Sequence, residues 1–62
     1  MSITEAVAEL YKEDAALFEN IVDFEAKLTD AGLNIDDDDL IKSLYDARYE
    51  IIELSNELSN NT

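Results

Sequence analysis

Two runs of apolar residues, spaced alternately by four and three positions, flank the single glycine of this chain, Gly32. This spacing places each run along one side of an α-helix. The runs comprise Ile3, Val7, Leu10, Asp14, Leu17, Ile21, Phe24, Leu28 and Ala31, and then Leu40, Leu44, Ala47, Ile51, Leu54 and Leu58. Only Asp14 is polar. The pattern predicts an all-α antiparallel helical hairpin whose two helices bury these stripes against each other.

The first predicted helix covers 3–31 and has a start signal at each residue type that such a signal needs. Ser2 and Glu5 match a capping box, in which the serine hydroxyl accepts from the Glu5 amide and the glutamate reaches back. Gly32 follows as a residue able to adopt the left-handed conformation that commonly ends a helix. We expect the whole chain, 1–62, to form a single domain.

The second predicted helix covers 37–59 and follows a turn over 32–36. With Asp36 as the helix cap, Ile35 and Leu40 are spaced to form a hydrophobic staple. A connection of this length makes consecutive helices antiparallel neighbours.

A run of four aspartates, 36–39, precedes the second helix. Carboxylates there are stabilised by the partial positive charge of a helix N-terminus. A calcium loop is the alternative, but the glycine and the later glutamate of an EF-hand are missing. We therefore expect a helix start and no metal site.

A second, displaced stripe gives each helix a broad apolar face. Its members are Tyr11, Ala15, Phe18 and Val22 on the first helix, and Ile41, Tyr45, Arg48 and Ile52 on the second. A domain of 62 residues without cysteine or histidine has neither disulfides nor zinc to supplement a small core. This favours a homodimer of hairpins forming a four-helix bundle. The alternative is that the second stripe binds a different protein.

The predicted dimer or partner interface extends to the end of the hairpin. Pairing the helices outward from the turn places Leu10 beside Leu58, so that Ile3 and Val7 overhang the second helix. Tyr49 adds an aromatic anchor of the kind that is common in interfaces. The full candidate set is Ile3, Val7, Tyr11, Asp14, Phe18, Val22, Ile41, Tyr45, Arg48, Tyr49 and Ile52.

Asp14 interrupts the first stripe with a carboxylate. A single polar group at such a position can specify helix register or form an ion pair, here with Arg48 or a tyrosine hydroxyl of another subunit. Exposure at an open end and a catalytic role are the alternatives. Catalysis would require a second carboxylate or a base nearby, and the stripe contains none.

The charge is strongly negative, because sixteen acidic residues oppose four basic ones and give a net charge of −12. This opposes direct binding to nucleic acid or to anionic membranes, both of which need lysine and arginine. It favours encounter with basic partners, although solubility alone is the other interpretation. The predicted acidic face consists of Glu5, Glu9, Glu13, Glu19 and Asp23.

Residues for chemistry are scarce in this sequence. Without histidine or cysteine, the chain lacks the usual general base and the thiol nucleophile. We expect no enzymatic activity, no cofactor, no metal and no small-molecule substrate. With no apolar run of about 18 residues and no signal peptide, we expect a soluble, cytoplasmic protein.

The segment Asp36-Asp-Asp-Asp-Leu-Ile-Lys-Ser-Leu-Tyr-Asp-Ala-Arg, with the short turn and the heptad helices, resembles the Rop family of helical hairpins. The resemblance implies dimerisation into a four-helix bundle. Rop-type proteins regulate plasmid copy number and bind RNA through a basic, polar and aromatic face of the first helix. Here that helix has only Lys12 and Lys27 among many acids, so the resemblance implies the bundle without the RNA activity.

These features predict a small acidic protein-binding module. The favoured form is a homodimeric inhibitor or regulator, of the type encoded by phages and mobile elements, that occupies a basic or functional surface of a host protein. The alternative is a structural or assembly subunit, or a chaperone-like adaptor, that binds a permanent partner through its apolar stripes.

Overall fold

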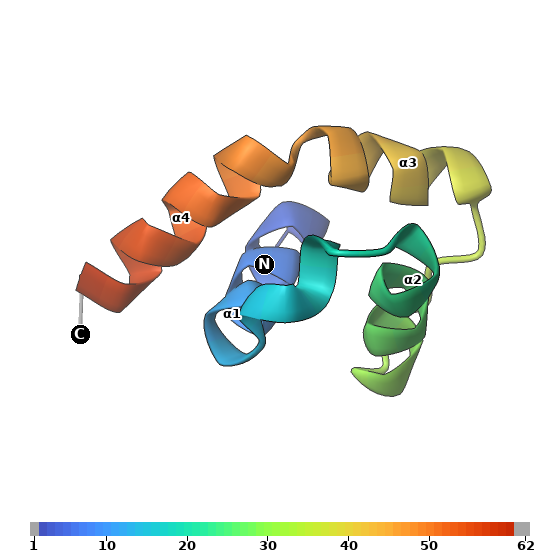
Figure 1. Ribbon diagram of the computed structural model, residues 1–62, viewed down its shortest axis with the longest axis horizontal. Coiled ribbons are helices and arrows are strands. Elements are labelled where there is room, and N and C mark those ends of the chain that lie inside the picture. Colours follow the sequence, from blue (N-terminus) through green and yellow to red (C-terminus); the bar gives the residue numbers. More distant parts are fainter. Residues whose placement is uncertain (1, 61–62) are drawn as a thin grey trace.

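The chain is all-helical over residues 2–60, the part that the computed structural model describes, and this confirms the predicted fold class (Figure 1). The elements are α1 (Ile3–Glu13), the short 3₁₀-helix η1 (Ala15–Phe18), α2 (Ile21–Asp30), α3 (Asp38–Asp46) and α4 (Arg48–Asn60). Helices α3 and α4 follow each other in a long, bent rod, with α1 packed against α4 and α2 packed against α3 (Figure 1). The predicted domain boundaries at residues 1, 61 and 62 lie outside the described residues.

The predicted continuous helix over 3–31 is wrong, because the backbone leaves the helical conformation at Asp14 and again at Asn20. Both residues are extended, with φ/ψ of −140/95° and −147/132°. The Asp14 Oδ1 accepts a hydrogen bond from the Ala16 amide at 3.1 Å, and the Asn20 Oδ1 accepts one from the Val22 amide at 2.8 Å. Short polar side chains compete in this way for backbone amides that a continuous helix would use. Each break therefore ends one helix and caps the next.

These breaks shorten the molecule and allow it to fold back on itself. A straight helix over 3–31 would be about 43 Å long. The longest dimension of the structure is 31 Å. The two halves of the predicted first helix thus contact different parts of the second one, since α1 lies against α4 and α2 lies against α3.

The helix-end signals near Ser2 and Gly32 are confirmed. The Glu5 amide donates to the Ser2 hydroxyl at 3.2 Å. Gly32 has a φ of 80°, and the amides of Gly32 and Leu33 donate to the carbonyls of Thr29 and Leu28, both at 3.0 Å. This is the Schellman pattern, in which a left-handed residue satisfies the last carbonyls of a helix.

The predicted helix over 37–59 is interrupted only at Ala47, whose φ/ψ of −84/13° separates α3 from α4. Hydrogen bonds still bridge the interruption, because the Ala47 amide donates to Ser43 at 2.9 Å and its carbonyl accepts from Ile51 at 3.1 Å. The cap of α3 is Asp37 and not the predicted Asp36. Its Oδ1 accepts from the Asp39 amide at 2.9 Å.

The hydrophobic core lies entirely within one chain. Its buried members are Val7, Ala8, Leu17, Phe24, Leu28, Ile41, Leu44 and Ile51. A cluster of aromatic rings packs against it, with ring centroids 5.5 Å apart for Tyr11 and Phe18, 4.9 Å for Phe18 and Phe24, and 6.2 Å for Phe24 and Tyr45. The two apolar stripes of the sequence therefore converge on one core, because the breaks turn their faces toward each other.

The predicted overhang of Val7 is wrong. Its side chain is fully buried, whereas Ile3 remains 38% exposed. Because the chain turns back after Asp14, α1 lies against α4 and α4 covers a full turn of it that a straight hairpin would leave open.

Candidate protein-binding groove

A groove runs between the α1–η1 segment and α2. It consists of three adjoining hollows with volumes of about 220, 270 and 240 Å³. The first and second share Leu10, Glu13 and Ala31, so they are continuous. The second and third share Asp14 and Lys27 among other residues, and the groove continues through them. We call the three hollows together the acidic groove.

The lining of the acidic groove combines an apolar floor with carboxylates. The apolar side chains are Ala6, Leu10, Ala16, Leu17, Ala26, Ala31 and Leu33. The carboxylates are Glu9, Glu13, Asp14, Glu19, Asp23 and Asp30, and Lys27 is the one cation among the lining residues. Six negative groups against one positive group make this surface attractive to cations.

Helical spacing explains how these charges are gathered. Glu9 and Glu13 are four residues apart on α1, and Asp23, Lys27 and Asp30 are four and three residues apart on α2. Residues at these spacings lie on the same face of a helix. The break between α1 and α2 then places the two faces on opposite sides of the groove.

An ion pair between the Lys27 ammonium and the Asp14 carboxylate crosses the middle of the groove. The Lys27 hydrogen bond, followed by that of the Ala16 amide, lowers the pKa of Asp14. Asp14 in turn raises the pKa of Lys27, and Asp30 and Asp23 add to this effect. Asp14 therefore forms an ion pair, as one of its interpretations expected. The predicted partners were wrong, because the cation comes from the same chain and is not Arg48.

The ion pair predicts a pH dependence that the variant Asp14→Asn isolates, since asparagine retains the oxygen that caps η1. The folded-state pKa of Asp14 lies below its ordinary 3.8, so its ionised form favours folding above that value. This contribution is lost as the pH falls through the folded-state pKa. We expect urea midpoints of wild type above those of the variant at pH 7, and equal midpoints near pH 2. A difference that is unchanged at pH 2 would contradict this role of the charge.

The predicted interface residues do not share one surface. Val7 and Ile41 are buried in the chain's own core, so they are not accessible to a partner. Tyr11, Phe18 and Tyr45 are partly buried in the aromatic cluster, and Ile52 is partly buried on α4. The residues left exposed are Ile3, Val22 and Tyr49, of which Val22 and Tyr49 are 68% and 70% exposed.

Arg48 packs between two aromatic rings. Its guanidinium carbon lies 5.3 Å from the ring centroids of both Tyr45 and Tyr49. A cation above an aromatic face is attracted by the ring quadrupole. This arrangement uses Arg48 within the chain, at the start of α4, instead of at Asp14.

Four members of the predicted acidic face lie on the acidic groove, namely Glu9, Glu13, Glu19 and Asp23. Glu5 instead accepts from the Ser2 hydroxyl at 3.4 Å in the capping box. The sequence interpretation missed Lys27 and Asp30 as groove residues. Their spacing from Asp23 was the available signal, but its meaning depends on where the first helix breaks.

Two structural findings concern the residues of the chain from 2 to 60. Among them, no group of three or more acidic, histidine or cysteine side chains is placed to hold a metal ion. The aspartate run provides the cap and the first turn of α3. None of the helices in this part of the chain is long and apolar enough to cross a lipid bilayer.

Comparisons with models of known families, with curated proteins and with solved structures found no match. The resemblance to Rop-type hairpins therefore stays a prediction, and α1, η1 and α2 stand where that layout has one helix. The function is argued from the acidic groove itself.

Proposed function

We propose that this chain is a small, non-enzymatic protein-binding module that holds a basic surface of another protein in its acidic groove. The observation that carries the proposal is the combination of six carboxylates with an apolar floor in one continuous groove. The carboxylates attract and orient a basic partner, while the apolar floor provides area that is buried on binding. The net charge of −12 adds long-range attraction to the same partner.

Inhibition or regulation is the form of this function that fits the chain best. A module of 62 residues that covers a basic surface competes with whatever else binds there. Nucleic acid is the most frequent ligand of basic protein surfaces, and its affinity depends on the same lysines and arginines. Such a regulator, of the phage or mobile-element type, acts by occupation and needs no chemistry of its own.

A capture experiment with matched charge variants tests the proposal. The groove variant replaces Glu13 by Gln and Asp23 and Asp30 by Asn, and the control variant replaces Glu50, Glu53 and Glu57 by Gln. Both remove three charges, but the control residues lie on the exposed side of α4, outside the groove. From an extract of the native host, wild type and the control variant should retain a partner that the groove variant loses at least tenfold.

Salt provides the second measurement. Raising NaCl from 0.1 to 0.5 M shortens the Debye length from about 10 to about 4 Å, so binding in the groove should weaken strongly. Equal retention of the partner by all three proteins would overturn the proposal. Retention that ignores salt but is lost with Val22→Ser and Tyr49→Ser would instead support an assembly subunit that binds through exposed apolar side chains.

Self-association into a four-helix bundle is a second proposal, and it is supported by four exposed large apolar side chains, Ile3, Ile21, Val22 and Tyr49. Their burial between two copies would add to a small core. Sedimentation equilibrium at micromolar concentration should then give about twice the chain mass. A monomer whose thermal stability is independent of concentration would rule the dimer out.

A further inference from the structure

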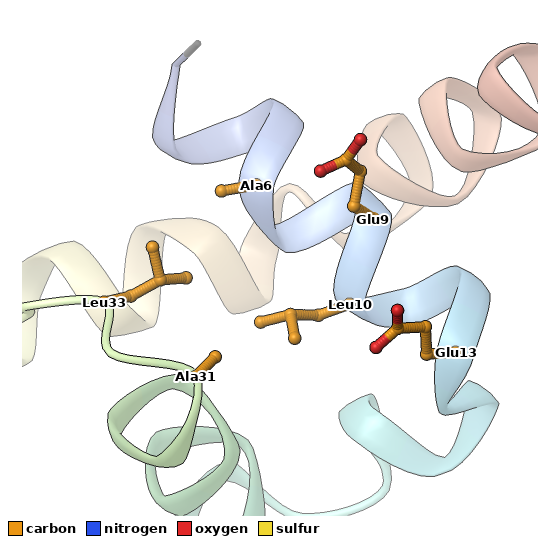
Figure 2. A pocket seen from close by; sticks show the side chains of 6 residues that line it. All are labelled: Ala6, Glu9, Leu10, Glu13, Ala31 and Leu33. Atoms are coloured by element: carbon orange, nitrogen blue, oxygen red, sulfur yellow. The ribbon is translucent and has the colours of Figure 1, made fainter.

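One end of the acidic groove, between α1 and the segment after α2, forms a notch with a defined shape. Its floor consists of Leu10 on one side and Ala31 and Leu33 on the other, which point toward each other across the gap (Figure 2). Glu9 and Glu13 stand one helical turn apart along the α1 edge of the same hollow (Figure 2). The notch is thus apolar at its base and doubly negative along one rim.

The middle of the groove provides an internal example of what such a surface holds. There the Lys27 side chain lies in a hollow that Leu10 and Leu17 also line, and its ammonium pairs with Asp14. Lysine and arginine place their methylene stems on apolar surface in this way while the charged head reaches a carboxylate. Because this hollow shares Leu10 and Glu13 with the notch, both are parts of one surface with one chemistry.

The notch has the carboxylates of this arrangement without the cation. Over residues 2–60, the pair between Lys27 and Asp14 is the one ion pair, so Glu9 and Glu13 have no cationic partner there. Both glutamates are exposed, and Leu10 and Leu33 are only partly buried. A basic group with an apolar stem would complement both features at once.

We propose that the notch receives a lysine or arginine side chain of a basic amphipathic segment of another protein. The stem of that side chain lies on Leu10 and Leu33, and its charged head lies between Glu9 and Glu13. A peptide segment fits better than a free amine, because the groove continues beyond the notch and offers further apolar floor and carboxylates to neighbouring side chains. This inference rests on the proposed function and specifies the partner's chemistry.

Titration of the ¹⁵N-labelled chain with a synthetic peptide, acetyl-(Lys-Leu-Ala-Lys)₃-amide, tests the inference by amide chemical shifts. We expect the largest shifts at residues 6–13 and 31–33. The double variant Glu9→Gln and Glu13→Gln should weaken the Kd about 2- to 30-fold, as expected for the loss of two exposed ion pairs. Glu50→Gln with Glu53→Gln removes the same charge from α4 and should change the Kd less than twofold.

Two further peptides separate the contributions. Replacing every lysine of the peptide by glutamine, or every leucine by alanine, should each weaken binding, because the notch requires both a cation and an apolar contact. Glutamine replaces glutamate on an exposed helix face with little change in helix propensity, so the variants should fold, and circular dichroism checks this.

The outcomes that overturn the inference differ from those that overturn the proposed function. Shifts confined to residues 19–30, equal weakening by the α4 variant, or no binding to wild type at millimolar peptide would show that the notch does not take a basic side chain. The proposed function would survive the first of these, since the rest of the groove would still bind. It fails separately if the groove variant retains the host partner.

Discussion

Replacing Phe24 by alanine should leave the chain largely unfolded at 25 °C. Phe24 is completely buried and is the largest of the fully buried side chains of the described residues, and its ring contacts both Phe18 and Tyr45. Removing a buried phenylalanine ring costs about 3 to 5 kcal/mol. A chain of this length has a total stability of only about 3 to 9 kcal/mol. We therefore expect most of the free energy of unfolding to be lost.

Urea titration followed by circular dichroism measures this loss, and Val22→Ala is the matched control. Val22 lies two residues away on the same helix but is 68% exposed, so its replacement should change stability by about 0.5 kcal/mol or less. Similar midpoints for the two variants would show that α2 does not bury Phe24 against α3 and the aromatic cluster.

Replacing Val7 by aspartate should also abolish folding, whereas the same change at Ile3 should be tolerated. Val7 is fully buried between α1 and the rest of the core, and Ile3 is 38% exposed at the first position of α1. Val7→Asp loses about 1.5 to 3 kcal/mol of apolar burial and in addition buries a charge without a partner. At Ile3 the new carboxylate faces the partial positive charge of the helix N-terminus, which offsets the lost contact.

This pair of variants also distinguishes the folded-back chain from a straight hairpin. In a straight hairpin both positions overhang, and both substitutions would be mild. Thermal unfolding followed by circular dichroism should show a cooperative transition for Ile3→Asp and none for Val7→Asp. Cooperative transitions of similar midpoint for both variants would contradict the packing of α1 against α4.

The break at Asp14 connects the fold with the candidate function. One carboxylate ends α1, caps η1 and pairs with Lys27 in the middle of the acidic groove. A continuous helix over 3–31 would have carried Glu13 and Asp30 along one rod, with no opposing wall. Because the chain turns back, these residues line the same hollow. The groove is therefore a product of the same local competition that shortened the helix.

The sequence by itself determined the all-α class, the helix-end signals at Ser2 and Gly32, the acidic charge and most of the core. These follow from local chemistry and periodicity: a hydroxyl beside an amide, a glycine at a positive φ, and apolar residues on one helical face. The candidate groove could be predicted only in part, because Glu9, Glu13, Glu19 and Asp23 were recognised as acidic while their opposing wall was not.

Only the tertiary structure decided where the predicted helix over 3–31 breaks and which faces meet. Asp14 and Asn20 have side chains that can either point outward from a helix or cap a new one, and the two states differ little in local free energy. Packing of α1 on α4 and of α2 on α3 favours the broken form, because it buries both apolar stripes within one chain. Periodicity specifies an apolar face but not its partner, so the core, the groove and the pairing of Asp14 with Lys27 emerged only when the chain folded back.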